Sequence, residues 1–225
     1  MVVRLSACGT NKVEWSVLGM NKVITISRQY GSGGREIGEK LAKKFGIPFY
    51  DNELISRAAK ESGFAETAFE NVEMKATNSL LYSIAMGMSA YTSPEMGFTQ
   101  LSLDDRIYFA QADVIRKVAM EGPCVIVGRC ADYILKDFDN VVNVFIWADL
   151  DYRVRRATSL YEMSPHKAEE NILKIDKRRA NYYNYHANEK WGKIENYHIA
   201  INSNYGGINH AVECLWNFIK REKNE

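Results

Sequence analysis

Apolar residues occur along the chain in short continuous runs that alternate with segments of helical periodicity. The runs lie at about residues 23–26, 47–50, 124–127, 141–147 and 197–202, and they are rich in β-branched and aromatic residues. Between them, apolar residues recur at helical spacing, which predicts helices over about 34–44, 52–61, 102–121, 132–135 and 164–187, one that begins at Asp149 or Asp151, and one that begins after Gly206-Gly207. Strands that alternate with helices predict an α/β fold with a doubly wound, parallel, five-stranded sheet.

Three segments depart from this regular alternation. Residues 1–19 have no clear period, and we expect a loose N-terminal extension before a single domain over residues 20–225. Residues 64–101 contain scattered methionines, serines and glycines, which predicts a mobile helical insert. Residues 164–192 open with Ser164-Pro165, an N-cap followed by proline in the first turn of a helix, and carry a basic run. We expect this last segment to act as a lid.

The stretch from Ile24 to Gly38 combines a strand, a glycine-rich turn and the start of a helix. Glycines allow successive backbone N–H groups to turn toward an anion, and the N-terminus of a helix adds partial positive charge. The standard phosphate loop reads G-x-x-x-x-G-K-[ST]. Here Arg28 stands at the position of the first glycine, and Gly34 and Arg35 stand at those of the lysine and the hydroxyl residue. The stretch predicts a phosphate-binding loop, with a turn that binds nothing as the alternative.

Arginines follow several of the predicted strands. The carboxyl ends of parallel strands meet at one edge of the sheet, where ligands bind in folds of this class. Arginine suits phosphate because its rigid guanidinium presents five donors and stays charged. The candidates are Arg28, Arg35, Arg57, Arg129, Arg178 and Arg179, and for any one of them a solvated salt bridge is the alternative.

Composition excludes several classes of function. The chain has 225 residues with a net charge of +1, so it presents no global basic field for nucleic acid. Its four cysteines form no C-x-x-C pair, which predicts reduced thiols in a cytoplasmic protein. No apolar run reaches the length of a membrane span, so we expect no membrane partner.

These motifs together resemble the cytidylate kinase-like family of P-loop proteins. The resemblance rests on Ile-Ser-Arg-Gln-Tyr-Gly-Ser-Gly-Gly-Arg-Glu at 26–36, Tyr50-Asp51, Gly128-Arg129 and Asp-Lys-Arg-Arg-Ala-Asn-Tyr-Tyr at 176–183, and it runs from about Met20 to the C-terminus. It implies a nucleoside monophosphate kinase-like fold and transfer of the γ-phosphoryl group of ATP to CMP or dCMP with Mg²⁺. It also implies that Arg57, Arg129, Asp176 and Arg179 contact the acceptor and that Arg178 lies near the transferred phosphate.

The sequence departs from the family pattern where lysine follows glycine, because Arg35 follows Gly34, and where aspartate follows Gly-Arg, because Cys130 follows Arg129. The alternatives are a nucleotide-binding module with weak catalysis and a P-loop kinase for another small acceptor, and the oligomeric state stays open. The predicted catalytic residues are Arg35, Arg178 and Arg179. The predicted ATP and phosphate site comprises Arg28, Gly31, Ser32, Gly33, Gly34, Arg35 and Glu36. The predicted acceptor site comprises Asp51, Arg57, Gly128, Arg129, Asp132, Asp176 and Arg179, with Mg²⁺ held by Ser32 or Ser27.

Overall fold

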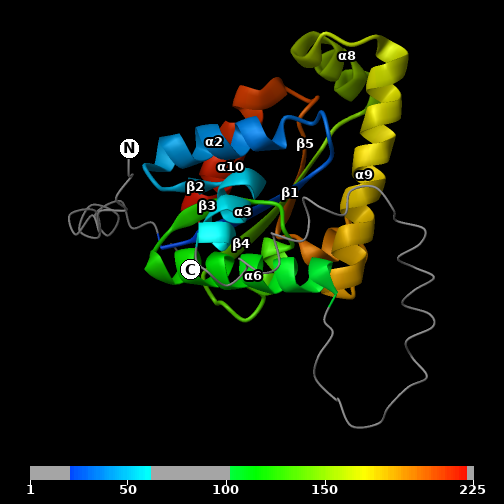
Figure 1. Ribbon diagram of the computed structural model, residues 1–225. Helices are drawn as coiled ribbons and strands as arrows, with labels where there is room; N and C mark the ends of the chain where they lie inside the picture. Colours follow the sequence, from blue (N-terminus) through cyan, green and yellow to red (C-terminus); the bar gives the residue numbers. More distant parts are fainter. Residues whose placement is uncertain (1–20, 62–101, 222–225) are drawn as a thin grey trace, which may run out of the picture. The chain divides into compact units, whose positions relative to one another are not determined.

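The computed structural model describes residues 21–61 and 102–221 (Figure 1). The expected extension at 1–19 and the expected insert at 64–101 lie outside the described residues. The chain divides into two compact units, one made of Met1–Glu53 with Ile115–Glu225 and the other of Leu54–Val114.

The first unit is built on a five-stranded sheet in the order β2-β3-β1-β4-β5, with every neighbouring pair parallel. The strands are β1 (Val23–Arg28), β2 (Phe49–Tyr50), β3 (Cys124–Val127), β4 (Val141–Trp147) and β5 (Ile199–Asn202). Strand β1 is central, with Ile24 in register with Val125 of β3 and Val142 of β4. The predicted parallel five-stranded α/β fold is confirmed.

Helices connect the strands close to the predicted boundaries. They are α2 (Gly34–Phe45), α3 (Asn52–Glu61), α6 (Leu103–Glu121), α7 (Ala131–Ile134), α8 (Leu150–Tyr161), α9 (Pro165–Ala187) and α10 (Gly207–Arg221), with a short 3₁₀ helix at Ile194–Asn196. Helix α9 begins as expected, because the Ser164 hydroxyl accepts a hydrogen bond from the Lys167 N–H (3.4 Å) and Pro165 occupies the first turn.

The main core lies between the sheet and the pair α2 and α10, which run side by side over one face (Figure 1). Ile24 and Ile26 of β1 meet Ile37 and Leu41 of α2, and all four side chains are buried. Gly38 lets α2 approach closely, because a Cβ there would lie 3.0 Å from the side chains of Ile26 and Val127. This packing holds the start of α2 against the carboxyl end of β1.

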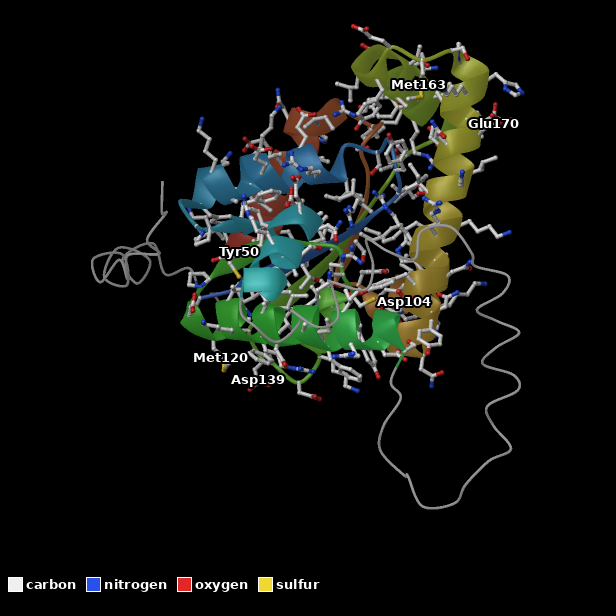
Figure 2. The ribbon with its side chains drawn as sticks, in the orientation of Figure 1. Tyr50, Asp104, Met120, Asp139, Met163 and Glu170 are labelled. Carbon is white, nitrogen blue, oxygen red and sulfur yellow. The ribbon has the colours of Figure 1, made fainter. Side chains whose placement is uncertain are left out.

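A second, smaller apolar cluster joins α8 and α9. Its buried members are Ala157, Ala168 and Ile172, and Met163 in the turn between the helices packs against them (Figure 2). Tyr30, from the loop after β1, packs on the same cluster. The long helix α9 is therefore tied to the loop that follows the central strand.

The unit Leu54–Val114 is described only for parts of α3 and α6. The Gln111 side chain donates a hydrogen bond to the Ser56 hydroxyl (3.1 Å), which links these two helices. Ser102 caps α6 by accepting from the Asp105 N–H (3.1 Å) and donating to the Asp105 carboxylate (2.7 Å). Among the helices over residues 21–61 and 102–221, none combines the length and apolar character needed to cross a membrane.

Candidate active site

The glycine-rich loop leads from β1 directly into the N-terminus of α2. Gly31 and Gly33 adopt φ values of 80° and 78°, the left-handed region that glycine occupies without strain. Gly33 is the N-cap of α2, and no side chain caps it. A Cβ at Gly33 would collide with Ile208, so the backbone there comes close to α10. The first N–H groups of α2 thus form an uncapped, partly positive helix end of the kind that binds anions.

The charged residues just after the glycines are engaged by other side chains. Arg35 donates from Nε to the Asp51 carboxylate (2.9 Å) and also pairs with Glu39 (3.4 Å), and its side chain is 61% exposed. Its contact with Asp51 raises the pKa of Arg35. Glu36 pairs with Lys40 (2.9 Å) and with Arg156. Neither Arg35 nor Glu36 is among the described residues that line the cleft described below.

The two serines predicted to hold Mg²⁺ occupy different environments. Ser32 is completely buried, and its hydroxyl donates to the carbonyls of Gln29 (2.8 Å) and Ile146 (3.2 Å). Ser27 lines the cleft, and its hydroxyl shares a hydrogen bond with Tyr197. Over the described ranges, no group of three or more His, Cys, Asp or Glu side chains is placed to hold a metal ion.

An arginine-rich cleft of about 330 Å³ opens beside the loop, at the carboxyl edge of the sheet. Four of the predicted arginines line it: Arg28 at the end of β1, Arg129 after β3, and Arg178 and Arg179 on α9. Its other described lining residues are Ser27, Asn52, Gly128, Cys130, Ile175, Tyr182, Tyr183 and Trp191. The described lining therefore contains four cations and several aromatic rings, but no carboxylate or imidazole.

Arg28 lies at the base of this cleft. It is half-buried, and its guanidinium packs so closely on Gly128 that a Cβ there would collide with it. Burial and the neighbouring charges of Arg179 and Arg129 lower the pKa of Arg28 to about 9. Within the described residues, its guanidinium has no hydrogen bond or ion pair. A bound anion would relieve this concentration of positive charge.

Arg129 extends from a strained turn after β3. Gly128, Arg129 and Cys130 have φ values of 86°, 59° and 54°, and left-handed backbone at the two non-glycine residues is energetically unfavourable. The Arg129 guanidinium lies over the Tyr182 ring (5.1 Å to the centroid) and donates to the Asn52 side chain. Burial raises the pKa of the Cys130 thiol to about 12, so this residue brings no charge to the position of the family's aspartate.

The remaining predicted acceptor residues lie elsewhere. Asp132 accepts a hydrogen bond from the Tyr183 hydroxyl (3.0 Å) behind the cleft, and burial raises its pKa to about 6. Asp51 is paired with Arg35, and Asp176 contacts the backbone of the glycine-rich loop rather than the cleft. Arg57 belongs to α3 in the unit Leu54–Val114.

Several residues of the site were not identified from the sequence. Tyr30 and Arg153 contact Asp176, and Asn52 and Trp191 line the cleft. A signal existed for Arg153, which lies one turn into the helix after the central strand β4, the same position relative to a strand that drew attention to other arginines. Trp191 follows the predicted lid helix, with no motif around it.

The sequence model of the cytidylate kinase-like family matches residues 23–205, which include the glycine-rich loop and all four cleft arginines. The chain belongs to the cytidylate kinase-like family. None of the curated proteins matches it significantly.

Solved structures resemble this family member in fold. An uncharacterized protein from Eubacterium ventriosum is 27% identical, with a TM-score of 0.68, and the match covers 89% of this chain and 99% of that one. A Thermus thermophilus protein is 17% identical (TM-score 0.56, 91% and 99% covered), and shikimate kinase from Bacteroides thetaiotaomicron is 15% identical (TM-score 0.50, 88% and 98% covered). These likenesses agree with a P-loop kinase fold.

Proposed function

We propose that the chain transfers the γ-phosphoryl group of ATP to a nucleoside monophosphate, with CMP or dCMP as the acceptor. The observation that carries this proposal is the convergence of Arg28, Arg129, Arg178 and Arg179 on one cleft beside the glycine-rich loop. Phosphoryl transfer needs two phosphates held in line, neutralisation of the charge that they share, and exclusion of water.

The loop and the start of α2 would bind the phosphates of ATP. Gly31 and Gly33 free the backbone from side chains, and the uncapped N–H groups of α2 point toward an anion at the helix end. The lysine of a standard P-loop is absent. We assign its electrostatic role to Arg28, because Arg35 is paired with Asp51 while Arg28 lies unpaired in the cleft.

The composition of the cleft favours a phosphate over a hydroxyl as the acceptor. A hydroxyl must lose a proton during transfer, and kinases that act on hydroxyls position a residue to accept it. The described lining of the cleft offers no carboxylate or imidazole for that role. A phosphate oxygen is already anionic, and Arg129 and Arg179 would hold it through charge-assisted hydrogen bonds. The rings of Tyr182 and Trp191 provide flat apolar surface for a base, and the choice of cytosine rests on the family.

Magnesium would enter with the nucleotide. The described residues offer no cluster of three ligands, and Ser32 uses its hydroxyl within the protein. Mg²⁺ in kinase sites is held largely by substrate phosphates and water, so Ser27 is the cleft oxygen that could join them. The ion would supply charge neutralisation, and the roles given above to the arginines do not depend on it.

A nucleotide-binding module with weak catalysis is the second candidate, favoured by the engagement of Arg35 with Asp51 at the expected lysine region. The test incubates the protein with ATP, Mg²⁺ and a panel of nucleoside monophosphates and small alcohols, and measures the release of ADP. We expect CMP and dCMP to give the highest kcat/KM. Release with an alcohol alone would indicate a different kinase, and ATP binding without release over any acceptor would indicate the module.

A further inference from the structure

The carboxylate of Asp176 lies on the phosphate loop. Its Oδ1 accepts a hydrogen bond from the backbone N–H of Tyr30 (2.7 Å), and its Oδ2 accepts one from Nη1 of Arg153 (2.5 Å). Both carboxylate oxygens are therefore used, and Asp176 is not among the described residues that line the arginine cleft. The resemblance to cytidylate kinases had instead implied that this residue contacts the acceptor.

Arg153 completes a grip on the same peptide. Its side chain is 8% exposed, and Nη1 also donates to the carbonyl of Tyr30 (3.3 Å). A Cβ at Gly31 would lie 3.0 Å from both Cβ and the carbonyl oxygen of Arg153, so the loop passes directly over the first turn of α8. The pair thus contacts Tyr30 at both its N–H and its carbonyl group.

The side chain of Tyr30 and a second residue of α9 strengthen this attachment. The Tyr30 ring stacks on Tyr161 (6.0 Å between centroids) and packs on the α8–α9 cluster. Arg179, three residues after Asp176, donates to the carbonyl of Arg28 (2.9 Å), and its guanidinium lies over the Tyr30 ring (5.7 Å). Residues three apart lie on one face of a helix, so α9 holds the loop backbone on both sides of Gln29.

From these contacts, we propose that Asp176 and Arg153 are positioning residues that set the conformation of the phosphate loop, and that Asp176 acts on the loop and not on the acceptor. The N–H of Tyr30 is occupied by a carboxylate, so nucleotide phosphates must bind the N–H groups that follow it, from Gly31 to the start of α2. The attachment also links the loop to the helix that carries Arg178 and Arg179, so both sides of the cleft are held in one arrangement. The kinetic part of this inference rests on the proposed function.

The experiment compares Asp176→Ala and Asp176→Asn with the wild type by three readouts. These are the dissociation constant for ATP, the KM for CMP, and the exchange rate of the Tyr30 amide hydrogen measured by NMR. We expect Asp176→Ala to weaken ATP binding at least tenfold and to speed exchange at Tyr30 at least tenfold, with the KM for CMP within about twofold of the wild type. Asp176→Asn can still accept from the Tyr30 N–H, and we expect smaller changes in the same direction.

Two further variants keep the outcome clear. Glu170→Gln removes a negative charge from the outer surface of α9 (Figure 2), where the side chain is 68% exposed, and it should leave all three readouts unchanged. Asp176→Ala leaves the buried Arg153 without its partner and can unfold the protein for that reason. The double variant Asp176→Ala with Arg153→Met removes both charges, and we expect it to fold and to retain the fast Tyr30 exchange and the weak ATP binding.

A raised KM for CMP with unchanged ATP binding and unchanged Tyr30 exchange would overturn the proposal and return Asp176 to the acceptor site. If no acceptor supports turnover, the proposed function fails. ATP binding and amide exchange still decide the role of Asp176 in that case, because neither measurement requires catalysis.

Discussion

The two ends of the phosphate loop carry arginines in opposite electrostatic situations. At the end of β1, Arg28 is half-buried beside Arg129 and Arg179, and burial with these like charges lowers its pKa to about 9. At the start of α2, Arg35 is 61% exposed and pairs with Asp51 and Glu39, and the contact with Asp51 raises its pKa.

The difference indicates which end of the loop serves a ligand. A cation that is already paired gains little from a bound phosphate, because it must first give up its carboxylate. Cations held together without carboxylates cost folding free energy, and an anion that binds among them recovers it. The unpaired end, at Arg28, is therefore where phosphate binding and charge stabilisation are expected, although the standard motif would place them at the start of the helix.

The largest effect should follow from Arg28→Met, which keeps the length of the side chain and removes its charge. We expect kcat to fall on the order of 10³-fold, the lower end of the range for an arginine that stabilises a phosphoryl-transfer transition state. The ligand-free variant should melt at a higher temperature than the wild type, because repulsion with Arg129 and Arg179 is relieved. Enzyme assays and thermal melts of the same preparations test both expectations.

Inorganic pyrophosphate extends this test without catalysis. It should raise the melting temperature of the wild type and raise that of Arg28→Met much less, because a ligand stabilises a protein in proportion to its affinity for the folded state. Arg155→Met, at an exposed arginine of α8, is the matched control and should behave as the wild type. A variant at Arg28 that keeps a tenth or more of kcat would remove the basis of the comparison.

The next effect concerns the cleft arginines that approach from the other elements. Arg129→Ala and, separately, Arg179→Ala should each lower kcat/KM on the order of 10²-fold, as expected for loss of one charge-assisted contact in the transition state. For Arg129→Ala the fold should stay intact, because only its contacts with Tyr182 and Asn52 are lost. Circular dichroism and steady-state kinetics measure this, and near-wild-type kinetics in both variants would contradict the site.

The sequence allowed much of the fold to be predicted, for identifiable reasons. Strand β4 is apolar almost throughout, and α9 begins with Ser164-Pro165, so local patterns defined both elements. The family motifs drew attention to the four arginines that the structure brings to one cleft. The contacts of Asp51 with Arg35 and of Asp176 with Tyr30 could not be predicted in this way. They depend on the direction in which a side chain points after distant elements pack, and a motif records only the residue and its place in the sequence.

Asp132 sharpens the comparison from the acidic side, because it contrasts with the paired Asp51. Asp132 is buried, and its described hydrogen-bond partner is a hydroxyl, that of Tyr183. Burial raises its pKa from 3.8 to about 6, so the folded protein keeps this proton at pH values where the unfolded chain has released it. The free energy of unfolding due to this group therefore decreases as pH rises from about 4 to about 6, by on the order of 2 kcal/mol, and stays lower above that.

Asp132→Asn removes this titration and keeps an oxygen that can accept from Tyr183. Urea unfolding of both proteins at pH 5 and pH 7.5 provides the measurement. The free energy of unfolding of the wild type, taken relative to that of the variant, should be lower at pH 7.5 than at pH 5. Equal differences at the two pH values would mean that Asp132 is not held protonated by burial.

The smallest effect is expected for Arg35→Met, the counterpart of the Arg28 variant at the other end of the loop. Its ion pairs with Asp51 and Glu39 involve an exposed side chain, and such pairs contribute less than about 1 kcal/mol to stability. The variant does leave the buried carboxylate of Asp51 without its cation, so the loss should become smaller as pH is lowered and that carboxylate is protonated. We expect kcat to change less than about fivefold, because the paired guanidinium is not among the described cleft residues. Kinetics of the two methionine variants, measured side by side, decide between the ends of the loop. A larger loss of kcat at Arg35 than at Arg28 would mean that Arg35 leaves Asp51 when nucleotide binds and takes the position of the missing lysine.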